Sequence, residues 1–251
     1  MIQITCIQID NFGPFTEKMG DNREHKIQIL LSELFIFLQK AFNRQNGLVF
    51  FVSKDNMIAV SNGISVEDHY LIIQEVEKKY PITISMGIGI GKTPIEAEYE
   101  ASSLLISKGS AQSSRKKVLA HNGQINSNNH KLKIAHVDIN FYTKIATDVF
   151  PLYSNFFNLK RGHITLMEAF REIGALCFFN GGDNFICVCP SSVKKEDIKL
   201  IIEEFEIKHV PWTLKAGIGC GHNILEAISK ANSCLRSIRE NNNVNKVMLL
   251  N

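Results

Sequence analysis

The sequence contains no long hydrophobic run, no secretion signal and little excess charge. None of its apolar segments approaches the roughly 18 consecutive residues of a membrane-spanning helix. The N-terminal residues MIQITCIQID also lack the basic-then-apolar order of a signal peptide. The formal net charge is only +3, well below that of a strongly basic nucleic-acid-binding domain. We therefore expect a cytoplasmic protein that binds neither membranes nor nucleic acids.

The six cysteines lack the spacing of a metal site, because no two of them form a Cys-x-x-Cys pair. Each lies instead in an apolar segment typical of a strand or a helix, which predicts buried, reduced thiols. These residues are Cys6, Cys177, Cys187, Cys189, Cys220 and Cys234. Neither a structural zinc site nor a disulfide framework is expected.

What the chain does contain is an internal repeat. Its 251 residues, of which 45% are hydrophobic, are enough for two modest domains. Residues 7–16 resemble 135–144, residues 50–60 resemble 178–188, and residues 85–97 resemble 215–227. The first two pairs have the same separation along the chain, and the separation of the third is only slightly larger. Three matches in the same order and at nearly constant spacing predict a tandem duplication.

Each repeat has the pattern of a β-α-β-β-α-β unit. In the first repeat, periodicity predicts a strand over 2–10, a helix over about 23–43, a hairpin over 47–60 and a helix over 66–79. A glycine-rich strand and a further helix follow. The predicted fold is α+β, a tandem duplication of a ferredoxin-like unit. We expect one unit over 1–108, a polar connector over 109–132 and a second unit over 133–251.

Two aspartates in each repeat are candidate metal ligands. Asp10 ends the first strand and Asp55 lies in the hairpin turn, beside Lys54; Asp138 and Asp183 are assigned the same places in the second repeat. In a ferredoxin-like sheet the first and third strands are neighbours, so each pair meets at one edge of the sheet. Two adjacent carboxylates repel unless a cation or proton intervenes, and Mg²⁺ takes one or two carboxylates plus substrate phosphates.

Neighbouring residues form a candidate substrate-binding set. Glycines beside Asp183 let a phosphate or base approach the backbone, the loop after Asp10 offers N–H groups to phosphate, and the asparagines orient a ligand or complete an Asx turn. The set comprises Asn11, Phe12, Gly13, Pro14, Asn56, Asn140, Gly181, Gly182 and Asn184. The alternative for each hairpin aspartate is a turn-forming role without a ligand.

Other motifs are better explained by packing. The segment GIGIGKT is not a phosphate-binding P-loop, because Met86 stands where that motif requires glycine. Its glycines predict close packing of a helix on a strand. Thr93, Pro94 and Glu96 predict the start of that helix. His136 and His222 are acid–base candidates, but a hydrogen-bonded structural histidine is the stronger interpretation of His136.

Taken together, these residues resemble a known family. A β-α-β-β-α-β unit with an aspartate on its first strand and GGDN at its hairpin resembles the catalytic palm of nucleotidyl cyclases and GGDEF domains. Two such units in one chain, with QIDNFGP, DNMIAVSNG, AHVDIN and FFNGGDNF in order, resemble the archaeal GTP cyclohydrolase III family across essentially the whole sequence.

The resemblance implies a Mg²⁺-dependent enzyme that acts on GTP. The implied product is 2-amino-5-formylamino-6-(5-phosphoribosylamino)pyrimidin-4(3H)-one, formed with release of two inorganic phosphates and feeding riboflavin and coenzyme F420 synthesis. By the same resemblance Asp10, Asp55, Asp138 and Asp183 are the metal positions, and a monovalent cation is a second candidate cofactor. A homo-oligomer is expected because ferredoxin-like sheets have open edges and faces.

Three points stay open at the level of sequence. The first is which repeat supplies the metals and which contacts the base. The second is the general base for attack of water at C8 of guanine. The third is the reaction itself, since a guanylate or diguanylate cyclase would use the same palm and release pyrophosphate, and a non-catalytic nucleotide-binding regulatory module would bind GTP without turnover.

Overall fold

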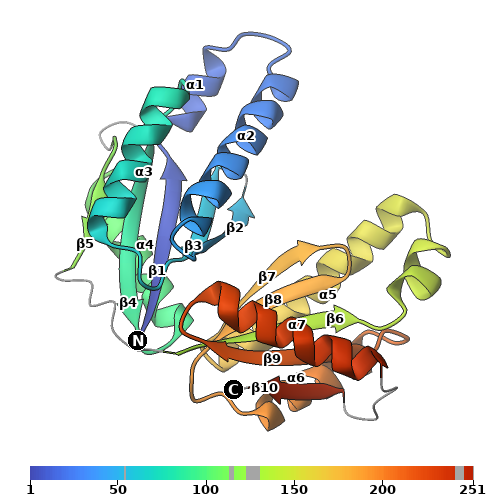
Figure 1. Ribbon diagram of the computed structural model, residues 1–251. Coiled ribbons are helices and arrows are strands. Elements are labelled where there is room, and N and C mark those ends of the chain that lie inside the picture. The colour runs from blue at the N-terminus through green and yellow to red at the C-terminus, as the bar shows by residue number, and fades with distance from the viewer. Residues whose placement is uncertain (54, 113–115, 123–130, 241–245, 251) are drawn as a thin grey trace. The chain divides into compact units, whose positions relative to one another are not determined.

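The computed structural model describes residues 1–53, 55–112, 116–122, 131–240 and 246–250, and the chain forms two compact units (Figure 1). The first unit comprises residues 1–92 and 96–129, and the second comprises residues 93–95 and 130–251. No helix in the described parts of the chain is long and apolar enough to cross a membrane.

The first repeat builds one five-stranded sheet. Its elements are β1 (Ile2–Ile9), α1 (Phe12–Glu17), α2 (Glu24–Asn43), β2 (Leu48–Ser53), β3 (Asn56–Val60), α3 (Val66–Lys79), β4 (Ile84–Gly91), α4 (Pro94–Ser107) and β5 (Leu119–His121). The strand order is β2-β3-β1-β4-β5, with β1 antiparallel to both β3 and β4. The first four strands form the predicted ferredoxin-like sheet. β5 lies in the segment expected to be a connector and pairs parallel to β4.

The second repeat has the same order of elements. They are β6 (Leu132–Ile139), the π-helix η1 (Thr143–Thr147), α5 (Leu152–Glu172), β7 (Leu176–Gly181), β8 (Asn184–Cys189), α6 (Lys195–Lys208), β9 (Leu214–Gly221), α7 (Ile224–Glu240) and β10 (Val247–Leu250). The strand order β10-β9-β6-β8-β7 repeats that of the first sheet, element for element. The predicted fold class, a duplicated ferredoxin-like unit, is confirmed.

Helices cover both faces of each sheet. In the first unit, α2 and α3 pack on one face, where alternate residues of β1 such as Ile7 and Ile9 point into a hydrophobic core. The helix α4 lies against the opposite face. A Cβ atom at Gly87 would lie 2.1 Å from the carbonyl oxygen of Ala101 on α4. The prediction that these glycines allow close helix packing is therefore confirmed.

The second unit repeats this packing. A Cβ atom at Gly217 on β9 would lie 2.0 Å from the carbonyl oxygen of Ala231 on α7. The start of α7 is capped by Asn223, whose side-chain oxygen accepts the backbone N–H of Glu226 at 2.9 Å. The Glu226 carboxylate in turn accepts the N–H of His222 at 2.8 Å, one residue before the expected cap.

The cysteines are reduced and buried, as predicted. The single tryptophan, Trp212, lies in the hydrophobic core of the second unit together with Cys177, Cys187 and Cys189. These side chains contribute apolar volume to that core. None of the six thiols forms a disulfide.

Candidate active site

Asp138 and Asp183 lie side by side at one edge of the second sheet. Asp138, near the end of β6, lies directly opposite Asn184 of β8. The carbonyl oxygen of Asp183 accepts the N–H of Ile139 at 3.2 Å, so the hairpin turn lies beside the end of β6. Burial, and then the negative charge of Asp138, raise the pKa of the Asp183 carboxyl group above its usual value.

Two basic side chains contact this carboxylate pair. Lys215, directly opposite Asp138 on β9, places its Nζ atom 2.6 Å from Oδ1 of Asp138. The guanidinium of Arg239, on α7, binds the other oxygen of the same carboxylate. Asp138 and Lys215 are nearly buried, whereas the Arg239 side chain is 56% exposed. The edge of the sheet thus gathers two carboxylates, one ammonium and one guanidinium.

The turn that carries Asp183 leaves open space in front of it. Gly181 and Gly182 have φ angles of 104° and 59°, a region that only glycine adopts readily. No atom lies within 4 Å of the position a Cβ would take at Gly181. Asn184 donates a hydrogen bond to the Asp183 carboxylate at 2.8 Å, and Asn140 accepts one from Lys215 Nζ at 3.0 Å. Both predicted asparagines therefore position the charged groups.

In the first unit the aspartates have different surroundings. Asp10 is 3% exposed, and its carboxylate accepts three hydrogen bonds from neutral donors. These are the hydroxyls of Ser85 (2.6 Å) and Thr83 (2.9 Å) and the backbone N–H of Lys117 (2.9 Å). The carboxylate thus ties β4 to the segment before β5, which is a structural role.

Asp55 lies in a turn organised by its own neighbours. The hydroxyl of Ser53 donates to the Asp55 carboxylate at 2.7 Å, and the Asn56 amide donates to the Ser53 hydroxyl at 3.0 Å. Lys54, which the sequence places in the same turn, lies outside the described residues. These contacts are those of a turn-forming aspartate.

The pairing of the strands corrects the alignment of the two repeats. Gln8 lies opposite Asn56 on β3, whereas Asp138 lies opposite Asn184 on β8. The N–H of Asp10 donates to the carbonyl of Thr83 (2.9 Å), and the N–H of Asn140 donates in the same way to Thr213 (2.8 Å). Asp138 therefore corresponds to Gln8, and Asp10 corresponds to Asn140. The expectation that Asp10 corresponds to Asp138 was wrong.

The cause is a difference in loop length between the repeats. Residues of β6 and β9 follow their counterparts in β1 and β4 by the same number of positions along the chain. Residues of the second hairpin follow their counterparts in the first hairpin by two positions fewer. The second unit is therefore shorter by two residues between its first and second strands. The sequence comparison placed Asp10 over Asp138 because the residues around them are similar, and this hid the shift. After correction, paired carboxylates face each other in the second unit, and the first unit has Gln8 and Asp55 at those places.

The loop after Asp10 forms a short helix. Asn11 has a φ angle of 52°, and the six-residue α1 begins at Phe12 and includes Gly13 and Pro14. The N–H of Asn11 donates to the carbonyl of Ala111 at 2.6 Å, so this predicted phosphate donor already has a partner. A phosphate-binding role for these residues stays a prediction.

The charged groups that sequence reasoning missed are Lys215 and Arg239. Lys215 had a visible signal, because a lysine inside the apolar segment LKAGIGCG must be paired if it is buried. Arg239 had none, since it is one of several polar residues near the end of a helix. His136, an acid–base candidate, contacts Asn232 at 2.6 Å and Asn184 at 2.9 Å, in agreement with a structural role.

The described residues contain no group of three or more histidine, cysteine or acidic side chains arranged to hold a metal ion. Two carboxylates with bound phosphates are nevertheless sufficient for Mg²⁺. Oxygen ligands of this kind suit a hard cation and do not suit zinc, which favours sulfur and nitrogen. Asp138 and Asp183 are therefore the residues that fit a Mg²⁺ ion.

Comparison with known proteins gives matches over the full length of the chain. A family model described as GTP cyclohydrolase III matches residues 1–251. A protein named GTP cyclohydrolase III from Methanothermobacter thermautotrophicus is 42% identical over 240 residues, covering 95% of each chain. A protein of the same name from Methanobrevibacter smithii is 41% identical over 245 residues, covering 97% of this chain and 96% of its own.

Among solved structures, the active GGEEF domain of a diguanylate cyclase from Vibrio cholerae aligns with a TM-score of 0.37 and 16% identity, covering 49% of this chain and 84% of its own. A bacterial light-regulated adenylyl cyclase aligns with a TM-score of 0.38 and 15% identity, covering 44% of this chain and 71% of its own.

Proposed function

Because the chain belongs to the GTP cyclohydrolase III family, we propose that it is a GTP cyclohydrolase whose reactive centre lies at Asp138 and Asp183. The proposed reaction consumes three waters. One water adds to C8 of guanine and the C8–N9 bond breaks, so that the formyl group stays on N7. Two more waters cleave the phosphoanhydride bonds, which releases two inorganic phosphates and leaves the monophosphate of the formylaminopyrimidine.

The observation that carries this assignment is the difference in charge pairing between the two units. In the second unit two carboxylates adjoin a lysine and an arginine, all held at the edge of one sheet. In the first unit Asp10 is held by neutral donors from its own unit. A site for a cation and a polyphosphate needs carboxylates for the first and basic side chains for the second, which favours the second unit.

The carboxylates would hold Mg²⁺. When bound, this ion neutralises phosphate charge and favours attack of water on phosphorus. Asp138 is nearly buried, and its position is set by pairing on both sides of β6, with Asn184 and with Lys215. Asp183 is placed by the glycine turn and by the Asn184 amide. Asp138 is thus held by the sheet, and Asp183 is held by the hairpin turn beside it.

Lys215 and Arg239 would bind the triphosphate. Both contact Asp138, which offsets the cost of a charge removed from water. With Asp138 engaged in holding a metal ion, Lys215 and Arg239 would be able to bind the phosphates. Arg239, at the exposed end of α7, has the freedom to make that change, whereas Lys215 has less.

The experiment that tests the function is incubation of the purified protein with GTP and Mg²⁺. Products are resolved by mass spectrometry, and phosphate is measured in parallel. We expect a formylaminopyrimidine ribonucleoside monophosphate and two inorganic phosphates for each GTP. A cyclic guanine nucleotide with pyrophosphate would replace this proposal by a cyclase, and unchanged GTP with folded protein would replace it by a binding module.

A further inference from the structure

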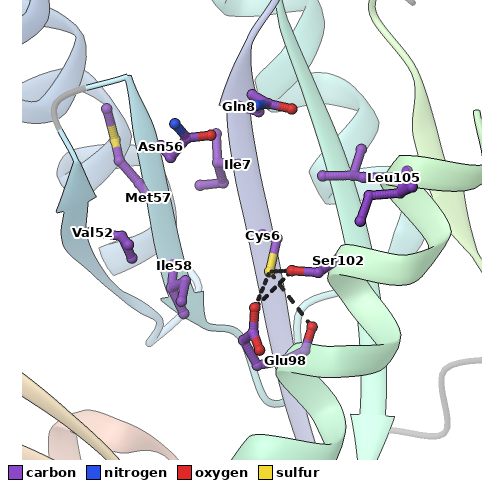
Figure 2. A pocket seen from close by; sticks show the side chains of 11 residues that line it. Cys6, Ile7, Gln8, Val52, Asn56, Met57, Ile58, Glu98, Ser102 and Leu105 are labelled. Carbon is purple, nitrogen blue, oxygen red and sulfur yellow. Dashed lines mark hydrogen bonds between the residues drawn. The ribbon is translucent and has the colours of Figure 1, made fainter. Parts of the chain in front are cut away.

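A hollow of about 250 Å³ opens in the first unit, between α4 and the strands β1, β2 and β3 (Figure 2). It lies on the face of the sheet opposite α2 and α3. Sites for drug-sized ligands usually occupy about 300–1,000 Å³, so this hollow suits a single ring system rather than a whole nucleotide. Neither the carboxylate pair at Asp138 nor its basic neighbours belong to it.

One side of the hollow carries a single carboxylate with fixed orientation. Glu98 on α4 accepts a hydrogen bond from the Ser102 hydroxyl at 2.7 Å. The Cys6 sulfur on β1 lies 3.4 Å from that hydroxyl and 3.9 Å from the same Glu98 oxygen, Oε1, and Figure 2 shows the three side chains converging. Burial, together with the nearby Glu98 charge, raises the pKa of Cys6 to about 12. The thiol is therefore neutral, and Glu98 supplies the charge.

Apart from the Glu98 side and the polar residues Gln8 and Asn56, the walls of the hollow are apolar. Ile58 on β3 and Leu105 on α4 line it. Two further lining residues, Val52 on β2 and Ile106 on α4, are 61% and 75% exposed. Apolar side chains left in water beside a partly buried carboxylate are typical of a site that receives a ligand with flat apolar faces and a polar edge.

The second unit has different residues at the corresponding positions. With the corrected alignment, His136 replaces Cys6, Ile228 replaces Glu98 and Asn232 replaces Ser102. The imidazole of His136 contacts Asn232 on α7 and Asn184 on β8, and so bridges the gap between helix and strand. In the first unit the smaller Cys6 leaves that gap open, and Glu98 adds a charge that the other copy lacks.

We propose that this hollow binds a guanine base, whose N1–H and N2 amino group both donate to the Glu98 carboxylate. An ionised carboxylate has two oxygens with about four acceptor sites and no donor, so Glu98 can accept two adjacent N–H groups in addition to the Ser102 hydroxyl. Adenine presents an unprotonated N1 at the same edge and would be repelled. That the ring is guanine, rather than another ring with two such donors, rests on the proposed function.

The bound guanine belongs to a second guanine nucleotide, separate from the GTP that is hydrolysed at Asp138 and Asp183. This nucleotide would add a second binding event per chain, and its loss would leave the KM for GTP unchanged.

The test is calorimetric titration of the full chain with GMP, IMP and AMP in the absence of divalent metal, so that no turnover occurs. We expect wild type to bind GMP about 10-fold more tightly than IMP, which lacks the amino group. Glu98→Gln should weaken GMP binding about 10- to 100-fold and narrow the preference for GMP over AMP. Glu75→Gln, the same charge change on an exposed site of α3, should bind like wild type.

A second variant covers the case in which Glu98→Gln does not fold. Cys6→His introduces the residue that bridges this gap in the second unit, and it should remove the Glu98-dependent binding of GMP. Equal affinities of wild type for GMP and IMP, or unchanged GMP binding by folded Glu98→Gln, would overturn the proposal. This result is independent of the product assay. If the protein turns over GTP but GMP binding does not depend on Glu98, only the proposed base site is wrong. If GMP binding depends on Glu98 but GTP is not turned over, only the proposed reaction is wrong.

Discussion

Asp138 occupies in the second unit the position that Gln8 occupies in the first. Each lies on the first strand of its sheet, opposite the asparagine that follows the hairpin turn, Asn184 or Asn56. The duplicated sheet therefore presents a carboxylate pair in one copy and an amide with a carboxylate in the other. The two copies therefore differ in charge at this end of the sheet, which is the pattern of a duplicated fold with divided roles.

The carboxylate pair predicts a clear asymmetry among the aspartate variants. Asp138→Asn or Asp183→Asn should lower kcat for GTP at least about 100-fold, because in the proposed mechanism each removes a charge that acts on the reacting phosphates or their cation. Asp55→Asn should change kcat less than about 3-fold, since the Asp55 carboxylate accepts a hydrogen bond from Ser53 of its own turn. Steady-state assays on variants with unchanged circular dichroism spectra measure both effects.

Asp10→Asn is the matched control for burial. Its new amide group would face three hydrogen-bond donors, so the free energy of unfolding should fall by about 1.5–3 kcal/mol. The folded fraction should nevertheless retain kcat. If Asp10→Asn lost as much kcat as Asp138→Asn while staying folded, the assignment of the reactive centre to the second unit would be wrong.

Arg239 predicts an effect on substrate binding with little effect on stability. Its side chain is 56% exposed, and the nearly buried Asp138 carboxylate keeps Lys215 as its other partner when Arg239 is replaced, so the variant should stay folded. Arg239→Gln should raise the KM for GTP about 10-fold, through loss of a charge-assisted phosphate contact. Arg236→Gln, on an exposed site of the same helix, serves as the control. Equal KM values for the two variants would count against phosphate binding by Arg239.

Much of this architecture follows from local sequence patterns. The helix over Val66–Lys79 has the predicted bounds, because its apolar spacing and its Ser65 cap both act within a few residues of the chain. The central β1–β3 pairing follows from the hairpin and from the connectivity of a ferredoxin-like unit. Strand β5 was missed, because three residues in a polar segment carry too little pattern to indicate a strand.

The site was harder to predict than the fold. The four aspartates were visible, but their correspondence depended on register, and a shift of two residues keeps each side chain on the same face of its sheet. The alternation of apolar residues therefore could not reveal the shift. Arg239 reaches Asp138 from 101 positions along the chain, and a contact of that kind requires the packed helix to be known.

The glycines under α4 predict a stability effect caused by packing. A Cβ atom at Gly87 would lie 2.1 Å from a backbone oxygen of α4, so Gly87→Ala must displace the helix and should cost about 1–3 kcal/mol. At Gly63 the space is open, but φ is +85°, and Gly63→Ala should cost about 1 kcal/mol through backbone strain alone. Chemical denaturation measures both. Because α4 also lines the hollow, Gly87→Ala should in addition weaken GMP binding, and Gly63→Ala should not.

His69 predicts how the first unit responds to acid. Its side chain is fully buried; one ring nitrogen lies 2.8 Å from the Thr5 hydroxyl and the other 2.6 Å from the carbonyl oxygen of Ser65. Burial lowers the pKa of His69 to about 4, while nearby Asp68 and His121 act in opposite directions. A folded-state pKa below the unfolded value of about 6.5 means that protons bind the unfolded chain more readily.

The stability that depends on neutral His69 is therefore complete above pH 6.5 and is lost as the pH falls from 6.5 toward 4. Between pH 7 and pH 5 this loss should amount to about 2 kcal/mol. His69→Gln cannot take up this proton, so its stability should fall less over the same range, although it starts lower at pH 7 because the buried contacts are disturbed. Thermal unfolding of both proteins by circular dichroism at several pH values measures the difference. Parallel curves would mean that His69 takes up its proton as readily in the fold as in the unfolded chain, which would contradict the burial of a neutral imidazole between Thr5 and Ser65.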